Sequence, residues 1–169
     1  RRIVWLTLAY LYALIYLGAY VRHSNAILSC SGWPLCNGRL VPAPGMGPLV
    51  WINFAHRIGA LVGAVLFLVL CREGWGLRTR RPDLTIATVA AVVFLCVQIL
   101  AGGAVARSGF ALWSALAHGA LLAPVFGAVS YLCLQVLPRR RCSADRTADL
   151  PAPDSRSLPI HATRQRSRA

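Results

Sequence analysis

The sequence predicts an all-α membrane protein, a four-transmembrane-helix bundle followed by a disordered basic C-terminal tail. Two observations predict this class: 57% of the residues are hydrophobic, yet the formal net charge is +13. The two properties are separated along the chain, because apolar residues fall in four blocks and most arginines lie between or after them. Charges placed in this way flank a membrane rather than form a nucleic-acid-binding face. We therefore expect no nucleic-acid binding.

Each apolar block is close to the ~20 residues that span a hydrocarbon core. The first, Ile3–Val21, follows Arg1 and Arg2 as a signal-peptide core would. It is longer than such a core, however, and no small-residue cleavage site closes it. An outer loop, 22–48, comes next. We expect the other helices at about Leu49–Cys71, Leu84–Ala106 and Ala111–Leu137, so that 1–137 forms the bundle.

The arginines predict the orientation, because positively charged loops stay in the cytoplasm. Two at the N-terminus, four between the second and third helices and eight in the tail lie on one side, whereas Arg22, Arg39 and Arg107 lie on the other. Both termini are thus expected in the cytoplasm, in a multi-pass protein of the cell inner or plasma membrane. The tail, 138–169, has few apolar residues to bury, which predicts a disordered, mainly solvated segment beside anionic membrane lipid.

Two histidines lie inside the apolar blocks, where ionisable residues are costly and often functional. His56 lies seven residues after Leu49, and His118 lies seven residues after Ala111. Both helices run inward from the outer surface, so at ~1.5 Å per residue each histidine lies about 10 Å below it. Two imidazoles at one depth on two helices of one bundle suit the axial ligation of a single haem.

The residues near these histidines are small, which either lets helices pack closely or leaves room for a flat macrocycle. The alternative to haem is a pair of histidines hydrogen-bonded across helices. The small residues are Gly59, Ala60 and Gly63 on one helix, and Ser114, Ala115 and Gly119 on the other.

Arg57 directly follows His56 inside the second block. Haem propionates would point toward the outer surface, within reach of Arg57 or Arg22, and an arginine fork suits carboxylates. A snorkelling or backbone-bonded Arg57 is equally compatible with the sequence.

The outer loop contains Cys30 and Cys36 with Trp33-Pro34 between them. A turn at this dipeptide could bring the cysteines together, and the outer side is oxidising, so a disulfide can persist there. A C-x₂-C zinc spacing is absent and no histidine pair accompanies the cysteines. We therefore expect a disulfide or a redox-active dithiol rather than a metal site.

Together these segments resemble the heme A synthase family, the membrane enzymes that complete haem A for cytochrome oxidase. The resemblance covers roughly Ile3–Leu137, and the cysteine loop followed by His-Arg on the next helix is its most specific part. The matching runs are Gly18–Arg22 (GAYVR), Leu28–Gly38 (LSCSGWPLCNG), Asn53–Ala60 (NFAHRIGA) and Gln98–Val105 (QILAGGAV), with His118 on the following helix.

The resemblance implies an oxidoreductase that converts the C8 methyl of haem O to a formyl group by successive hydroxylations, giving haem A. Family members usually contain eight helices in two similar four-helix bundles, each using histidines of its second and fourth helices for one haem. This chain resembles one such half. His56 and His118 match the histidine positions, Cys30 and Cys36 the outer-loop pair, and Arg57 the arginine of the His-Arg motif.

Three departures from the family pattern bear on turnover. Asn53 occupies the position where the catalytic half usually has Glu, and an amide cannot accept a proton as a carboxylate does. Ser31-Gly32 replaces the usual Asp of the loop. Only one bundle is present, which implies a homodimer or a second four-helix bundle as partner. We expect either Asn53→Glu or such a partner to be needed for haem O oxidation.

Three functions are compatible with the sequence. The first is a heme A synthase-like enzyme, with haem b or haem O/A as cofactor, haem O as substrate and haem O synthase as a further partner. The second is a non-enzymatic bis-His b-type cytochrome, which the absence of an intramembrane Asp or Glu favours. The third is a haem-free assembly scaffold.

Overall fold

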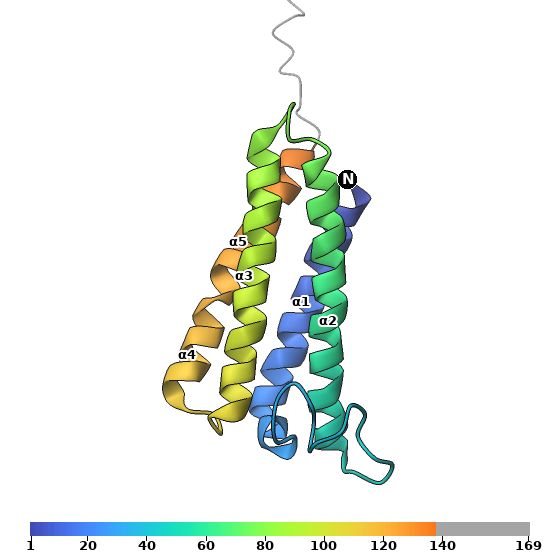
Figure 1. The fold of residues 1–169 in the computed structure, drawn as a ribbon, viewed down its shortest axis with the longest axis vertical. Helices are drawn as coiled ribbons and strands as arrows, with labels where there is room; N and C mark the ends of the chain where they lie inside the picture. Colours follow the sequence, from blue (N-terminus) through green and yellow to red (C-terminus); the bar gives the residue numbers. More distant parts are fainter. Residues whose placement is uncertain (138–169) are drawn as a thin grey trace, which may run out of the picture. The chain divides into compact units, whose positions relative to one another are not determined.

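The computed structural model describes residues 1–137, and this part of the chain is a helical bundle (Figure 1). The prediction of a disordered tail concerns residues 138–169, which lie outside the described residues. Within residues 1–137 there are no strands, only an isolated bridge between Cys36 and Arg39. The elements are α1 (Arg2–His23), η1 (Ala26–Ser29), α2 (Pro48–Trp75), α3 (Pro82–Arg107), α4 (Leu112–Ala120) and α5 (Leu122–Val136).

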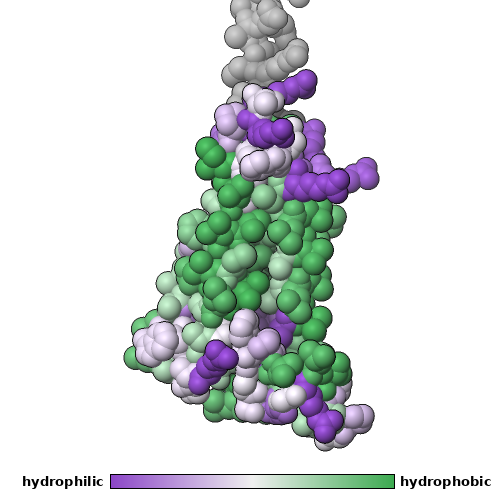
Figure 2. Space-filling view, viewed as in Figure 1, coloured by the Kyte–Doolittle hydropathy of each residue, from purple (hydrophilic) through white to green (hydrophobic). Residues whose placement is uncertain are grey.

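The predicted fold class is confirmed, because four helical segments are long and apolar enough to cross a membrane. These segments are α1, α2, α3 and the pair α4–α5 taken together. Figure 2 shows a hydrophobic surface along the middle of the bundle, with hydrophilic residues gathered toward its two ends. A bundle with this surface is suited to a hydrocarbon surrounding.

The last predicted helix, Ala111–Leu137, is divided in the structure. α4 ends at Ala120, and α5 begins at Leu122. Pro124 accounts for the division, since its ring replaces the N–H that would bond to the carbonyl of Ala120 and also crowds that carbonyl. The other helices run slightly past their predicted ends, and α2 continues four residues beyond Cys71 to Trp75.

The two ends of the bundle differ in what they carry (Figure 1). The outer loop, residues 22–48, and the α3–α4 turn, residues 108–111, share one end, which we call the loop end. The N-terminus of α1 and the α2–α3 turn share the opposite end, which we call the arginine end. It carries Arg1, Arg2, Arg72, Arg78, Arg80 and Arg81.

The core lies between the helices, midway between the two ends. Its main cluster combines side chains from α1, α2, α3 and α5, so all four spanning segments contribute, the last of them through α5. In a hydrocarbon surrounding, such side chains stabilise the contacts between helices mainly through van der Waals packing. The cluster consists of Leu11, Phe67, Ala91, Leu95, Val125 and Val129.

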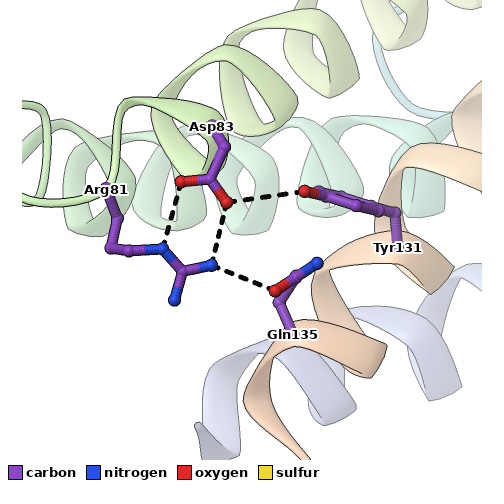
Figure 3. Close-up of polar contacts among 4 residues, drawn as sticks. All are labelled: Arg81, Asp83, Tyr131 and Gln135. Carbon is purple, nitrogen blue, oxygen red and sulfur yellow. Dashed lines mark hydrogen bonds and ion pairs between the residues drawn. The ribbon is translucent and has the colours of Figure 1, made fainter.

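At the arginine end a polar network ties the α2–α3 turn to α5 (Figure 3). Arg81 Nε donates to Asp83 Oδ1 at 3.1 Å, and Arg81 Nη2 donates to Asp83 Oδ2 at 2.8 Å and to Gln135 Oε1 at 3.0 Å. Tyr131 Oη donates to the same carboxylate at 3.5 Å. The hydrogen bonds that Arg81 donates to Asp83 raise the pKa of Arg81, which therefore stays charged. Because Arg81 and Asp83 are exposed, this pair fixes geometry more than it adds stability.

Candidate haem-binding site

His56 lies on α2 in the half of the bundle near the loop end. Its imidazole packs against Gly18 of α1 so closely that a Cβ at Gly18 would lie 2.9 Å from His56 Cε1. His56 Nδ1 is buried and has no hydrogen-bond partner among the described residues. A buried polar atom without a partner is costly and marks a place where a ligand can bind. Neutral imidazole can bind a metal through either ring nitrogen.

His118 lies on α4, and its imidazole also packs against a glycine of a neighbouring helix. We call Gly18 and Gly102 the seats of the two histidines. A Cβ at Gly102 of α3 would lie 3.1 Å from His118 Cε1. His118 Nδ1 lies 3.1 Å from the backbone carbonyl oxygen of Gln98. Because a carbonyl oxygen only accepts, Nδ1 carries the proton, and the lone pair of the ring is then on Nε2. Histidines that bind metals commonly donate their other N–H to a carbonyl in this way.

Gln98 is a buried polar side chain on α3 beside His118. It is 6% exposed, and its Oε1 is buried without a partner among the described residues. Its Nε2 lies 3.5 Å from His118 Nε2, which is long for a hydrogen bond. The lone pair of His118 Nε2 is therefore only weakly engaged by the protein.

The two histidines lie at similar depths. α2 and α4 both begin at the loop end (Figure 1). His56 is eight residues beyond the first residue of α2, and His118 is six beyond the first residue of α4. At 1.5 Å per residue these positions are about 12 and 9 Å along their helices. The donor set fits the axial ligation of haem: both imidazoles pack on a glycine, His56 has a buried nitrogen without a partner, and His118 has a weakly engaged one.

The outer loop is closed by a disulfide between Cys30 and Cys36, as the sequence predicts. Both cysteines are buried, and their Cα atoms lie 4.9 Å apart. Asn37 Oδ1 accepts hydrogen bonds from the backbone N–H and the hydroxyl of Ser31, each at 2.8 Å. The loop between the cysteines is thus fixed both covalently and by hydrogen bonds.

The two arginines suggested for the propionates have different surroundings. The guanidinium of Arg57 is directed at the outer loop, where it donates to backbone carbonyls and to Asn53 Oδ1. Arg57 is thus bonded to backbone carbonyls in this structure, and a contact with a propionate stays a prediction. Arg22 is exposed at the loop end, and its guanidinium carbon lies 5.6 Å from the ring centroid of Phe110 in the α3–α4 turn.

A sequence model of the COX15-CtaA family, described as cytochrome oxidase assembly protein, matches residues 1–130. The chain belongs to the COX15-CtaA family. Curated relatives named heme A synthase are similar to it. The relative from Symbiobacterium thermophilum is 41% identical over 140 residues, which are 82% of this chain and 44% of that protein.

Two further heme A synthases show the same relation. The one from Alkalihalophilus pseudofirmus is 36% identical over 78% of this chain and 43% of its own length. The one from Geobacillus kaustophilus is 33% identical over 85% of this chain and 46% of its own length. This COX15-CtaA family chain therefore spans somewhat less than half the length of the curated relatives that it matches.

Three residues of the site had no role in the sequence analysis. Gly18, Gln98 and Gly102 lie in the runs by which the chain resembles the COX15-CtaA family, but the runs alone do not tell what these residues contact. In the structure, Gly18 and Gly102 seat the two imidazoles, and Gln98 accepts from one of them. The sequence contains one signal for the two glycines: twice, a helix that carries the glycine is followed by a helix that carries the histidine.

Proposed function

We propose that this chain is a haem-binding, heme A synthase-like membrane protein in which His56 and His118 are the axial ligands of one haem. The observation that carries the proposal is the matched pair of imidazoles. Each is seated on a glycine of a neighbouring helix, and His118 Nδ1 lies at a backbone carbonyl. A bis-His site of this kind is typical of haem held in a four-helix bundle.

The reaction that we propose is oxidation of the C8 methyl of haem O to a formyl group in haem A biosynthesis. Bound haem iron would supply the redox chemistry. The part of this chain is to hold and orient the macrocycle between two imidazoles and to keep water from it with apolar helices. Family membership and the heme A synthase relatives support this assignment.

The propionates need a cation near the loop end. We propose Arg22 for this role, since it is exposed there and its side chain rests only on an aromatic ring of the α3–α4 turn. Arg57 can take part only by giving up hydrogen bonds to the outer loop. The disulfide between Cys30 and Cys36 would influence activity through its redox state.

A second four-helix bundle completes this proposal. The chain spans less than half of each heme A synthase compared above, and no Asp or Glu lies inside the spans of residues 1–137 away from the arginine end. A carboxylate near the reacting methyl would stabilise developing positive charge in a dry site. We propose that a second bundle, from a copy of this chain or from a partner, completes the site in the inner or plasma membrane. Both termini would be cytoplasmic, and haem O synthase would deliver the substrate.

One observation favours a second candidate function, a b-type cytochrome that transfers electrons without altering its haem. Asn53 stands where the family's catalytic half has Glu, and its amide is already hydrogen-bonded. Haem extracted after expression beside a haem O source separates the functions. Haem A supports the enzyme, unmodified haem supports the cytochrome, and the absence of stoichiometric haem contradicts both in favour of a scaffold.

A further inference from the structure

The guanidinium of Arg57 is enclosed by the outer loop. All three of its nitrogens donate hydrogen bonds, four of which end on backbone carbonyls within or beside the disulfide ring. Nη1 donates to the oxygens of Leu35 at 2.8 Å, Gly32 at 3.0 Å and Pro34 at 3.3 Å, and Nη2 donates to the oxygen of Cys30 at 3.0 Å. An arginine has the planar fork needed for several carbonyls at once, whereas lysine offers a single point.

Asn53, one turn before Arg57, uses both ends of its amide. Its Oδ1 accepts from Arg57 Nε at 2.9 Å, and its Nδ2 donates to the carbonyls of Ala26 at 2.8 Å and Ile27 at 3.3 Å. The side chain is 5% exposed. A carboxylate could accept from Arg57 but could not donate to the two carbonyls. The amide therefore joins Arg57 to the start of the outer loop, a task that Glu at this position cannot perform.

The other side of the outer loop rests on α3. A Cβ at Gly103 would lie 2.8 Å from Trp33 Cδ2, so Trp33 fits against this helix only because residue 103 is glycine. Gly103 directly follows Gly102, the seat of His118. The loop thus contacts α2 immediately after His56 and α3 immediately after the seat of the other histidine.

From these contacts we infer that Asn53 and Arg57 are positioning residues that hold the disulfide loop as a fixed cover over the two histidine seats. We call the two residues and the loop carbonyls that they contact the clasp. The disulfide holds those carbonyls in the arrangement that Arg57 requires, and Arg57 in turn holds the disulfide ring closed. At equilibrium such coupling is reciprocal: weakening the clasp must favour reduction of the disulfide, and reducing the disulfide must weaken the clasp. Reduction should also become faster, because Cys30 and Cys36 are buried and a loosened loop exposes their sulfurs to attack.

The inference makes a prediction that does not depend on haem. An added dithiol such as dithiothreitol breaks the S–S bond of Cys30–Cys36 and gives two thiols, while the dithiol itself is oxidised to its cyclic disulfide. In membrane vesicles, the thiols formed can be trapped by alkylation and counted by peptide mass. We expect reduction at least ten times faster in Arg57→Lys and Asn53→Leu than in the wild type. Arg39→Lys, an exposed arginine of the same loop, should stay within twofold.

A second measurement tests whether Arg57 acts by binding the loop carbonyls or whether its replacement merely loosens the fold. Ethylguanidinium added to Arg57→Ala should restore slow reduction, because it supplies the missing fork at the same carbonyls; ethylammonium should not. A third readout needs no variant. Reduction of the wild type should speed tryptic cleavage after Arg39, since the loop loses its clasp.

Three results would overturn the inference. The first is that Arg57→Lys is reduced at the wild-type rate. The second is that ethylguanidinium fails to restore slow reduction to a folded Arg57→Ala variant. The third is that tryptic cleavage after Arg39 is no faster in the reduced wild type than in the oxidised one. None of the three measurements uses haem. A chain that binds no haem would therefore contradict the proposed function and leave this inference standing, and the reverse also holds.

Discussion

Gly18 of α1 lies beneath the imidazole of His56, so close that a Cβ would come within 2.9 Å of Cε1. Gly102 of α3 lies beneath His118 in the same manner, at 3.1 Å. Because a methyl group at either seat must displace the ring, the two glycines fix where the imidazoles point. The two pairs repeat one relationship: a glycine on one spanning segment and a histidine on the next segment along the chain.

The first prediction concerns these seats. Gly18→Ala and Gly102→Ala should each lower the free energy of unfolding by about 1–3 kcal/mol through overpacking and should weaken or shift the haem spectrum. Gly127→Ala on α5 is the matched control, because a Cβ there meets nothing within 4 Å and residue 127 adjoins neither histidine. It should be neutral or slightly stabilising. Equal effects of all three substitutions on the spectrum would contradict the assignment of the seats.

Gln98 gives the second prediction. Gln98→Leu removes the buried, unpartnered Oε1 but leaves the backbone carbonyl that accepts from His118 Nδ1. We expect the haem spectrum to be retained and the free energy of unfolding to rise by about 1 kcal/mol, since an unsatisfied polar group is lost. Loss of the haem spectrum would show instead that the side-chain amide, and not the carbonyl, orients the imidazole.

The third prediction concerns the disulfide in the native membrane. Under oxidising conditions Cys30 and Cys36 should resist alkylation until reductant is added, because both are buried and covalently linked. Addition of reductant to the same sample should then allow both cysteines to be labelled, which serves as the internal control. Complete labelling of Cys30 and Cys36 before reduction would refute the linkage.

The fourth prediction concerns Asn53 and the second bundle. Asn53→Glu would leave the carbonyls of Ala26 and Ile27 without their donor, at about 1 kcal/mol for each lost hydrogen bond. These contacts change the sequence-based expectation for Asn53→Glu: we now expect this variant to loosen the outer loop and to form no haem A alone. Co-expression of the wild type with a four-helix bundle that carries the family's Glu should yield haem A instead. Brisk haem O oxidation by Asn53→Glu alone would show that the amide is dispensable and that the second bundle is not required.

The bundle could be predicted from the sequence because each spanning helix is recognised from a continuous stretch of residues. Four apolar blocks of spanning length separated by arginine-rich turns leave few other arrangements in a membrane. The division between α4 and α5 was missed although Pro124 is visible in the sequence. The apolar block continues through it, and a proline inside a membrane helix can either bend or break the helix.

The site was predictable in part. Both histidines stand out as ionisable residues in apolar blocks, and their similar distances from the helix starts are a local property. The seats were not predictable, because Gly18 and His56 are far apart in sequence and meet only through the packing of α1 on α2. The role of Arg57 stayed open for the same reason. A propionate and a ring of loop carbonyls both suit a guanidinium, and only the folded loop brings the carbonyls to it.

The central claim, that His56 and His118 ligate one haem, is tested most directly by the absorption spectrum of the purified protein and its single histidine variants. The wild type should show a low-spin bis-His spectrum. His56→Ala and His118→Ala should each become high-spin or lose haem, while His23→Ala, at the exposed end of α1, should match the wild type. An unchanged low-spin spectrum in both His56→Ala and His118→Ala would contradict the claim.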